Sequence, residues 1–373
     1  MGTELMSAPQ AIASAVDLQR PPAETLFATE LERLKSWDRG RVPPGWRLSP
    51  PALERFILGD AALGVSSKVV VPRALLTRLI VALATNRGAM LVGVPGTAKS
   101  WLSELLACGI SGDSTLTVQG GAIGNIRQLL YGWNEAVLRQ RGPCPEALVP
   151  GPVYRGMRDG HIVRFEEIAR CSTEVQDGIL SILSERQILV PELDGERRVL
   201  FARAGFNIVA TSNTLDQGVR EMSAALKRRM NFETIEPIPE VGDEVEVVIR
   251  EASRALLGSG VSVTVAPDIV EVLVTIFHEL RNGQTVDGRS TDRLAAAVMS
   301  TAEAVSVVHA MGIHAYYYRD GTMHAEDLVH FLVGASLKDN REDRRRLRHY
   351  FDTEVALRQT PVWQVVYAHR ELL

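Results

Sequence analysis

Residues 93–100, with the sequence GVPGTAKS, have the composition of a phosphate-binding loop. An apolar run, 89–92, precedes them, and a helical pattern, 101–107, follows. A strand, a tight turn and a helix N-terminus in this order direct unpaired backbone N–H groups and the positive end of the helix dipole at an anion. Lys99 adds a charge for the β- and γ-phosphates, and the Ser100 hydroxyl can bind Mg²⁺. The predicted residues that bind ATP are Gly93, Val94, Pro95, Gly96, Thr97, Ala98, Lys99, Ser100 and Trp101.

Ala98 departs from the general pattern of such loops, G-x-x-x-x-G-K-[ST], in which a second glycine precedes the lysine. The order of strand, turn and helix still favours a phosphate loop. The alternative is an ordinary strand-to-helix turn that contains a Lys-Ser pair by chance.

Two carboxylates, Glu166 and Glu167, directly follow an apolar stretch, 161–165, that reads as a buried strand. Ligands of parallel α/β sheets lie at the carboxyl ends of the strands. We therefore expect Glu166 to hold the Mg²⁺ shell and Glu167 to polarise the water that attacks the γ-phosphate. Aspartate is usual at the first position, so the extra methylene predicts an imperfect metal shell, and Glu166→Asp should preserve or raise activity. The alternative is a solvated acidic pair.

Asn213 ends the next predicted strand, 206–211 with its polar continuation. An amide at this edge can position the attacking water between the γ-phosphate and Glu167. Asparagine is common after strands, so its place after the phosphate loop and the acidic pair supports the assignment more than its type does.

The elements that position these residues alternate between strand and helix patterns up to residue 238 and are helical afterwards. This order predicts an α/β fold with a central parallel sheet flanked by helices and followed by an all-α lid domain. The predicted divisions are an N-terminal extension, 1–62, a nucleotide-binding core, 63–238, and the lid with C-terminal helices, 239–373. More detailed expectations are a short strand at 68–71, one helix at 126–138, a hairpin at 187–202 around an Asp-Gly turn, and a helix at 291–310 capped by Ser290 and ended by Gly312.

The whole-chain composition is that of a globular protein: 46% of the 373 residues are hydrophobic and 23% are charged. The net charge of −4 makes nucleic acid an unlikely partner. The three cysteines lack C-x-x-C spacing, and no basic leader or uninterrupted apolar span occurs, which predicts a cytoplasmic protein without a membrane segment.

Several of these motifs resemble those of MoxR-type AAA+ ATPases, a class of P-loop NTPases. Residues 93–100 resemble G-x-P-G-x-A-K-[ST], in which alanine precedes the lysine, and 166–170 (EEIAR) are similar to D-E-I-N-R. Residues 151–154 look like G-P-[IV]-F, the 187–202 hairpin like a pre-sensor hairpin, and 225–230 like A-L-x-D-R-F. The resemblance covers about residues 63–310.

The resemblance implies an ATPase ring, usually a hexamer of identical chains, that uses ATP and Mg²⁺ to remodel a client protein as a chaperone would. Von Willebrand factor A-domain proteins are frequent partners of this class. In the A-L-x-D-R-F register Arg229 matches the arginine finger, and Arg228 is the alternative. Arg293 matches the lid arginine that reaches the γ-phosphate, and the neighbouring Arg289 is the competing assignment. A cation in the first turn of a helix after Ser290 would oppose the helix dipole, which favours a role in binding a ligand; a solvated arginine is the alternative.

Three other functions stay open at this point. A nucleotide-gated switch that binds ATP with little turnover is motivated by Glu166. A DNA- or RNA-acting AAA+ motor is opposed by the acidic net charge. The motor subunit of a metal chelatase is the remaining alternative.

Overall fold

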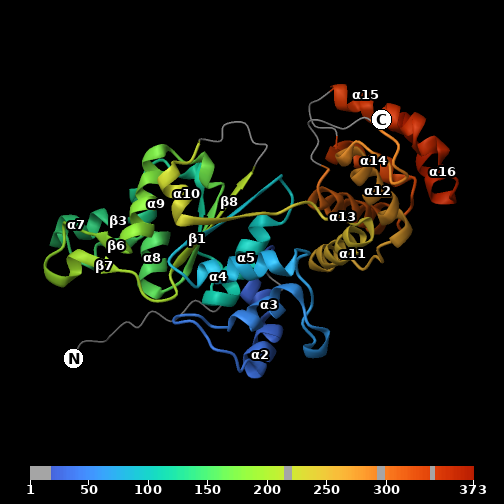
Figure 1. The fold of residues 1–373 in the computed structure, drawn as a ribbon. Coiled ribbons are helices and arrows are strands. Elements are labelled where there is room, and N and C mark those ends of the chain that lie inside the picture. The colour runs from blue at the N-terminus through green and yellow to red at the C-terminus, as the bar shows by residue number, and fades with distance from the viewer. Residues whose placement is uncertain (1–17, 214–220, 292–298, 337–340) are drawn as a thin grey trace.

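The computed structural model describes residues 18–213, 221–291, 299–336 and 341–373. Figure 1 shows a sheet-containing region, with helices on both of its faces, and a separate group of C-terminal helices beside it. The two regions are joined after the last strand of the sheet, at residues 235–240.

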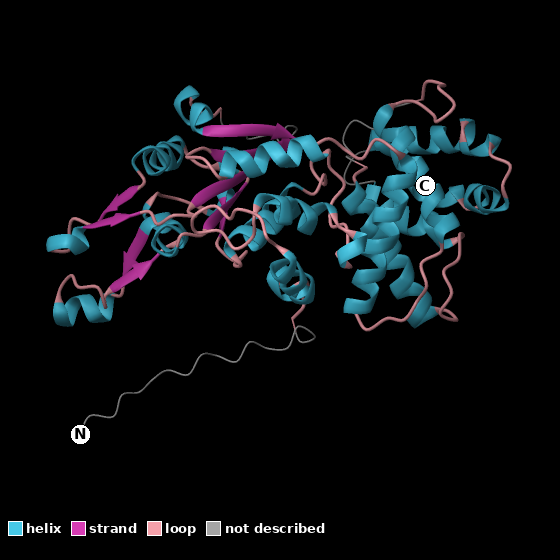
Figure 2. Ribbon diagram, turned by 60° about the horizontal axis from the view of Figure 1, so that its bottom comes forward, coloured by secondary structure: helices cyan, strands magenta, loops and turns pink. Residues whose placement is uncertain are grey.

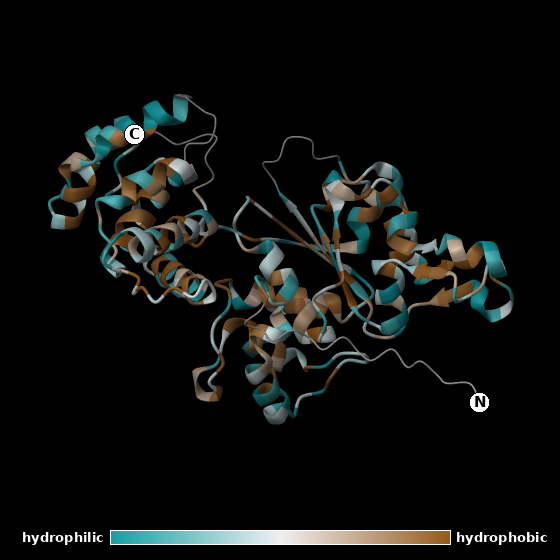
Figure 3. Cartoon of the chain, turned by 180° about the vertical axis from the view of Figure 1, so that it is seen from behind, coloured by the Kyte–Doolittle hydropathy of each residue, from teal (hydrophilic) through white to brown (hydrophobic). Residues whose placement is uncertain are grey.

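The central sheet has five strands in the order β2-β5-β8-β1-β9, and all neighbouring strands are parallel. Their bounds are Gly88–Gly93 (β1), Thr117–Gln119 (β2), Ile162–Glu166 (β5), Asn207–Asn213 (β8) and Met230–Thr234 (β9). Parallel strands covered on both faces are apolar along most of their length. The predicted parallel α/β sheet is confirmed, and Figure 3 shows its strands mostly in hydrophobic colours.

The two faces of the sheet are covered by different helices, as Figure 2 also shows. Alternate residues of β1 point to opposite faces: Ala89 and Leu91 lie in one core, and Met90 lies in the other. The first core contains α1 (Ala23–Leu26), α2 (Ala28–Trp37), α3 (Pro50–Leu58), α4 (Arg73–Leu83) and α5 (Lys99–Ser111). The second contains α6 (Arg127–Leu130), α8 (Pro152–Asp159), α9 (Thr173–Glu185) and α10 (Ala224–Arg229). The N-terminal helices therefore share a core with the phosphate-loop helix, α5.

Two antiparallel hairpins extend from the sheet region. The expected hairpin at 187–202 is confirmed as β6 (Gln187–Leu189) paired with β7 (Val199–Phe201). The expected helix at 126–138 is wrong, because β3 (Tyr131–Trp133) divides it and pairs with β4 (Leu148–Pro150). Helix α7 (Glu135–Arg141) then begins after Asn134, whose side chain accepts hydrogen bonds from two backbone N–H groups of its first turn.

The strand expected at 68–71 is also wrong. Within the described part of the chain this segment pairs with no strand; the N–H of Lys68 bonds instead to the carbonyl of Ile57 at 3.0 Å. Its apolar residues are used for packing, since Val69 lies in the core with α3 and α4. The described residues also form short 3₁₀ helices at Ala61–Leu63, Gly120–Ala122, Ile168–Arg170, Gly195–Arg198, Val355–Leu357 and Arg370–Leu372.

The C-terminal region is helical and has a hydrophobic core of its own. Its helices are α11 (Val241–Gly258), α12 (Pro267–Asn282), α13 (Thr301–Tyr318), α14 (Asp327–Ser336), α15 (Arg341–Thr353) and α16 (Pro361–Ala368). None of the helices in the described ranges is long and apolar enough to cross a membrane.

The expected helix at 291–310 differs from the described helix α13 (Thr301–Tyr318), because residues 299–300 are not helical and α13 continues past Gly312; the start of the expected helix falls on 292–298, outside the described residues. Helix α13 begins at Thr301, where Ser300 and Glu303 form a reciprocal capping box, and Ser290 lies in a β-bridge with Gln284. Gly312 lies inside α13 rather than at its end, and a Cβ there would meet Leu256 Cδ2 at 2.5 Å, so close packing with α11 favours glycine at this position. Residues 292–298, and with them Arg293, lie outside the described residues.

Candidate active site

The predicted chemical groups meet at the carboxyl ends of three neighbouring strands. Gly93 at the end of β1 pairs in register with Asn213 at the end of β8. On the other side of β8, strand β5 ends at Glu166, and Glu167 follows it directly. The parallel register therefore brings the phosphate loop, the acidic pair and the amide to one edge of the sheet.

The phosphate loop has a conformation that L-residues seldom adopt. Gly96 has φ of +78°, and Ala98, the N-cap of α5, is left-handed with φ 60° and ψ 22°. A left-handed conformation costs an alanine about 1 kcal/mol that a glycine would not lose. This explains why glycine is the general choice at the position of Ala98. A Cβ on Gly96 would lie 2.2 Å from the side chain of Ser300, so the start of α13 closely approaches the loop.

Lys99 is 5% exposed and its ammonium lies inside the loop. It donates to the carbonyl of Gly93 at 3.1 Å and to that of Val94 at 2.6 Å. Thr97 also donates to the Val94 carbonyl, at 3.0 Å, which ties the loop together. A cation enclosed by a loop of backbone amides is suited to binding phosphate oxygens.

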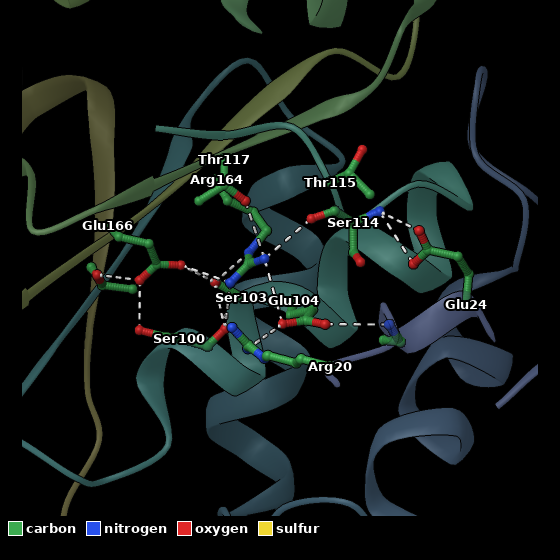
Figure 4. A network of polar contacts seen from close by, with 12 residues as sticks. Arg20, Glu24, Ser100, Ser103, Glu104, Ser114, Thr115, Thr117, Arg164 and Glu166 are labelled. Carbon is green, nitrogen blue, oxygen red and sulfur yellow. Dashed lines mark hydrogen bonds and ion pairs between the residues drawn. The ribbon is translucent and has the colours of Figure 1, made fainter. Parts of the chain in front are cut away.

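The carboxylate of Glu166 is buried and both of its oxygens accept hydrogen bonds. Oε2 accepts from the hydroxyls of Ser100 at 2.6 Å and Thr211 at 2.8 Å. Oε1 accepts from Ser103 Oγ at 2.9 Å and Arg164 Nη2 at 2.9 Å. Figure 4 shows this carboxylate at one end of a polar network, with dashed lines to Ser100 and Ser103 of α5 and to Arg164.

The Ser100 hydroxyl and the Glu166 carboxylate are hard oxygen donors of the kind that Mg²⁺ prefers. Among the described residues, no group of three or more His, Cys, Asp or Glu side chains could hold a metal ion alone. A site with one hydroxyl and one carboxylate fits Mg²⁺, which takes its other ligands from water and nucleotide phosphates.

Glu167 is held next to Asn213, as the sequence predicts for a pair that orients water. Asn213 Nδ2 donates to Glu167 Oε1 at 2.5 Å, and the Glu167 N–H donates to Thr211 Oγ1 at 3.1 Å. Glu167 is left-handed, with φ of +56°, a conformation that clusters at functional sites. A Cβ on Gly120 would lie 2.2 Å from the Glu167 carbonyl, so this glycine is required for the loop after β2 to approach.

Trp101 turns its indole away from the phosphate loop and toward the N-terminal helices. Its Nε1 donates to the Lys68 carbonyl at 3.1 Å, and its ring lies 6.0 Å from that of Phe27 between centroids. Its predicted contact with a nucleotide would therefore have to come from the backbone at the start of α5.

The structure does not bring Arg228 and Arg229 to the phosphate loop of the same chain. They end α10, and the next residue, Met230, pairs with Gly88 at the other end of β1 from Gly93. Five residues of strand separate these ends by about 17 Å. Arg229 Nε donates to Ser184 Oγ at 3.2 Å, whereas Arg228 lines an open cavity of about 480 Å³ together with Arg87, Lys227 and three residues of β9. Both arginines are exposed.

Four buried polar residues at or near Glu166 were not predicted from the sequence: Ser103, Arg164 and Thr211, which bind it, and Glu104, which pairs with Arg164. One signal was present, because Arg164 interrupts an otherwise apolar strand, and arginine is seldom buried without a partner. The spacing of Ser100 and Ser103 is a second signal, since residues three apart share one face of a helix.

Two family models match most of the chain. Residues 88–230 match the AAA domain of the dynein-related subfamily, and residues 242–373 match the YehL-like AAA+ ATPase C-terminal domain. YehL of Escherichia coli strain K12, described as an uncharacterized protein, is 52% identical over 357 residues, which cover 95% of this chain and 98% of YehL. An uncharacterized protein of Staphylococcus haemolyticus, SH1500, is 27% identical over 169 residues, 45% of this chain and 62% of that protein.

Among solved structures, NtrX of Brucella abortus in complex with ATP has a TM-score of 0.49 at 13% identity. The complex of NtrX with ADP has a TM-score of 0.48 at 14% identity. Both matches cover 81% of this chain and 64% of the NtrX chain.

Proposed function

Because this chain belongs to the YehL-like family of AAA+ ATPases, we propose that it binds ATP with Mg²⁺ and hydrolyses it. The observation that carries this proposal is the meeting of Ser100, Glu166, Glu167 and Asn213 beside the phosphate loop. A hydroxyl and a carboxylate lie 2.6 Å apart in the place of the metal ligands, and the amide touches the second carboxylate.

In this proposal each group has one role. The loop amides and Lys99 bind the β- and γ-phosphates. Ser100 and Glu166 hold Mg²⁺, which when bound neutralises the charge that develops on the phosphate oxygens. Glu167 accepts a proton from the attacking water, and Asn213 holds the Glu167 carboxylate in place by donating to Oε1.

The test is steady-state ATP turnover with Mg²⁺, together with binding of a fluorescent ATP analogue. Lys99→Ala should weaken nucleotide binding, because the enclosed cation is lost. Glu167→Gln should keep binding but reduce turnover by about 10²-fold or more, the scale of a lost general base. Lys35→Ala on α2 and Glu185→Gln at the end of α9, which are exposed, are the matched controls.

Two results would contradict the hydrolytic role. Wild-type turnover by Glu167→Gln would show that Glu167 is not the base. Tight Mg²⁺-dependent binding without turnover by the wild-type chain would favour a nucleotide-gated switch, the alternative that Glu166 in place of aspartate motivates.

The proposal extends to a cytoplasmic ring, with a hexamer of identical chains as its expected form. Its support is the position of Arg229, about a strand length from the phosphate loop of its own chain. A guanidinium there can stabilise transition-state charge on the nucleotide of a neighbouring subunit, and Arg228 is the alternative. MoxR-like remodelling of a protein client, with a von Willebrand factor A-domain protein as the expected partner, is the cellular role that we propose.

A further inference from the structure

A buried arginine, Arg164, lies in β5 two residues before Glu166. Residues two apart in a strand point to the same face of the sheet, so the guanidinium and the carboxylate both face α5. Nη2 of Arg164 donates to Glu166 Oε1 at 2.9 Å and to the Ser100 carbonyl at 3.0 Å. Its Nε donates to Ser103 Oγ at 3.0 Å, and that hydroxyl in turn donates to Glu166 Oε1.

We propose that Arg164 is a positioning residue for the Mg²⁺-binding carboxylate: it holds Glu166 Oε1 so that Oε2 faces the Ser100 hydroxyl. This inference rests on the proposed function, because it assigns the metal to Ser100 and Glu166. Each oxygen of the carboxylate then has a separate task. Arg164 and Ser103 donate to Oε1, whereas Oε2 accepts from Ser100 and Thr211 and would be the oxygen that holds Mg²⁺.

The far side of the guanidinium is anchored independently of Glu166. Nη1 of Arg164 donates to the Ser114 carbonyl at 3.1 Å and to Thr117 Oγ1 at 3.2 Å. These contacts come from the loop before β2 and from β2 itself. A planar group bound on several edges has one orientation, so Arg164 presents a fixed donor to Glu166.

A second buried carboxylate, Glu104 on α5, balances the charge of this arrangement. Its Oε2 lies 3.5 Å from Arg164 Nη1, and it is 4% exposed. The N-terminal segment also binds Glu104, through Arg20 Nη2 at 2.9 Å and the N–H of Ala23 at 3.2 Å (Figure 4). Without Arg164, Glu104 would keep, among the described residues, only the largely exposed Arg20 as its cation, and Glu166 would lose its buried cationic partner, an arrangement that costs free energy.

This arrangement explains why glutamate stands where aspartate is usual. An aspartate carboxylate would end about 1.5 Å closer to the strand, the length of one carbon–carbon bond. It could not keep hydrogen bonds of 2.6 Å to Ser100 and 2.9 Å to Arg164 at the same time. From these contacts we expect Glu166→Asp to weaken the metal site, which is the opposite of the expectation drawn from the sequence.

The test measures how Mg²⁺ tightens the binding of a fluorescent, non-hydrolysable ATP analogue. The readouts are the Mg²⁺ concentration at half-maximal tightening, the affinity in EDTA, and the melting temperature. Arg164→Met should raise the half-maximal Mg²⁺ concentration about 10-fold, the scale of losing a residue that orients a metal ligand. The affinity in EDTA should stay within about twofold, because the phosphate loop is intact. Arg164→Lys keeps the charge and a hydrogen-bond donor, so its half-maximal Mg²⁺ concentration should lie between those of Arg164→Met and the wild type.

A double-mutant cycle separates positioning from a general structural role. Glu166→Asp alone should also raise the half-maximal Mg²⁺ concentration, and adding Arg164→Met to it should change that value less than about twofold. The matched control is Arg186→Met. Arg186 is a half-buried arginine that donates to the carbonyls of Asn86 and Phe206 near the amino end of β8, away from the phosphate loop.

Several outcomes would overturn the inference. A lower melting temperature with a wild-type Mg²⁺ response in Arg164→Met would assign Arg164 to the fold alone. A lower half-maximal Mg²⁺ concentration would mean that Arg164 merely opposes the metal by its charge. If Arg164→Met does not fold, a wild-type response of Glu166→Asp overturns the inference by itself. Absence of any Mg²⁺ effect in the wild-type chain would instead overturn the proposed function.

Discussion

A buried carboxylate of the C-terminal helical region, Glu244 on α11, offers a quantitative test of how the start of α13 is held. It accepts hydrogen bonds from Thr301 Oγ1 at 2.6 Å and Arg281 Nη2 at 2.9 Å, and lies 2.5 Å from His278 Nε2. Burial alone raises the pKa of Glu244, but these hydrogen bonds and the charge of Arg281 outweigh it and lower the pKa to about 2 from 4.5.

The lowered pKa has a defined sign and size. A carboxylate with a depressed folded-state pKa stabilises the fold above its unfolded pKa, and this contribution is lost as pH falls toward the folded pKa. A pKa shift from 4.5 to about 2 contributes roughly 3 kcal/mol to the free energy of unfolding at neutral pH. At pH 3 the contribution is less than about half of that. Glu244→Gln should therefore lower the free energy of unfolding of the C-terminal helical region by roughly 3 kcal/mol at pH 7 and by clearly less at pH 3.

The assay is urea unfolding of the wild-type chain and of the Glu244→Gln variant at pH 7 and pH 3, monitored by tryptophan fluorescence. Trp363 reports on the core of the C-terminal helices, because it is part of that core. The control is Glu251→Gln, also on α11, whose partly exposed ion pairs with Arg250 and Arg254 should contribute less than about 1 kcal/mol. Equal losses in the two variants, or a Glu244→Gln loss that is the same at both pH values, would refute this reasoning.

The consequence for function follows from the position of α13. Arg281, which binds Glu244, also donates to the Met299 carbonyl at 2.9 Å, immediately before the Ser300 cap that faces Gly96 of the phosphate loop. We expect Glu244→Gln to weaken ATP binding as well as the stability of the C-terminal helices, because Thr301 and Arg281, which hold the start of α13 next to the phosphate loop, lose their charged partner.

Three further predictions concern the active site. Arg229→Ala and Glu167→Gln subunits should each be nearly inactive alone and regain ATP turnover when mixed, since some interfaces then pair an intact finger with an intact base; no recovery despite verified subunit exchange would contradict action between subunits. Ala98→Gly should keep ATP affinity and raise the free energy of unfolding by up to about 1 kcal/mol, because the left-handed strain is relieved; a loss of stability would count against it. Gly120→Ala should slow turnover more than it weakens nucleotide binding, since its Cβ would displace the Glu167 backbone; unchanged turnover would show that this close approach is dispensable.

The sequence by itself determined the parts of the site that depend on local order. A strand, a Gly/Pro turn and Lys99-Ser100 can form a phosphate loop from neighbouring residues alone. The positions of Glu166, Glu167 and Asn213 after apolar strands were sufficient to predict that these side chains lie near the loop, because parallel strands bring their carboxyl ends to the same edge of the sheet. The hairpin at 187–202 was likewise readable from short-range patterns.

Tertiary structure decided the features that depend on contacts between distant residues. Gly312 has the pattern of a helix end, but it lies within α13, where the close approach of Leu256 leaves no room for a Cβ. Residues 131–133 continue a helical pattern, but pairing with 148–150 makes them a strand. The two oxygens of Glu166 gain their separate partners only when α5, β5 and β8 assemble, so a departure from the usual aspartate looked like a defect in the sequence. The sequence pattern indicates which face of a helix or strand is apolar. The partner of a buried charge depends on which elements pack around it, and this is decided only in the tertiary structure.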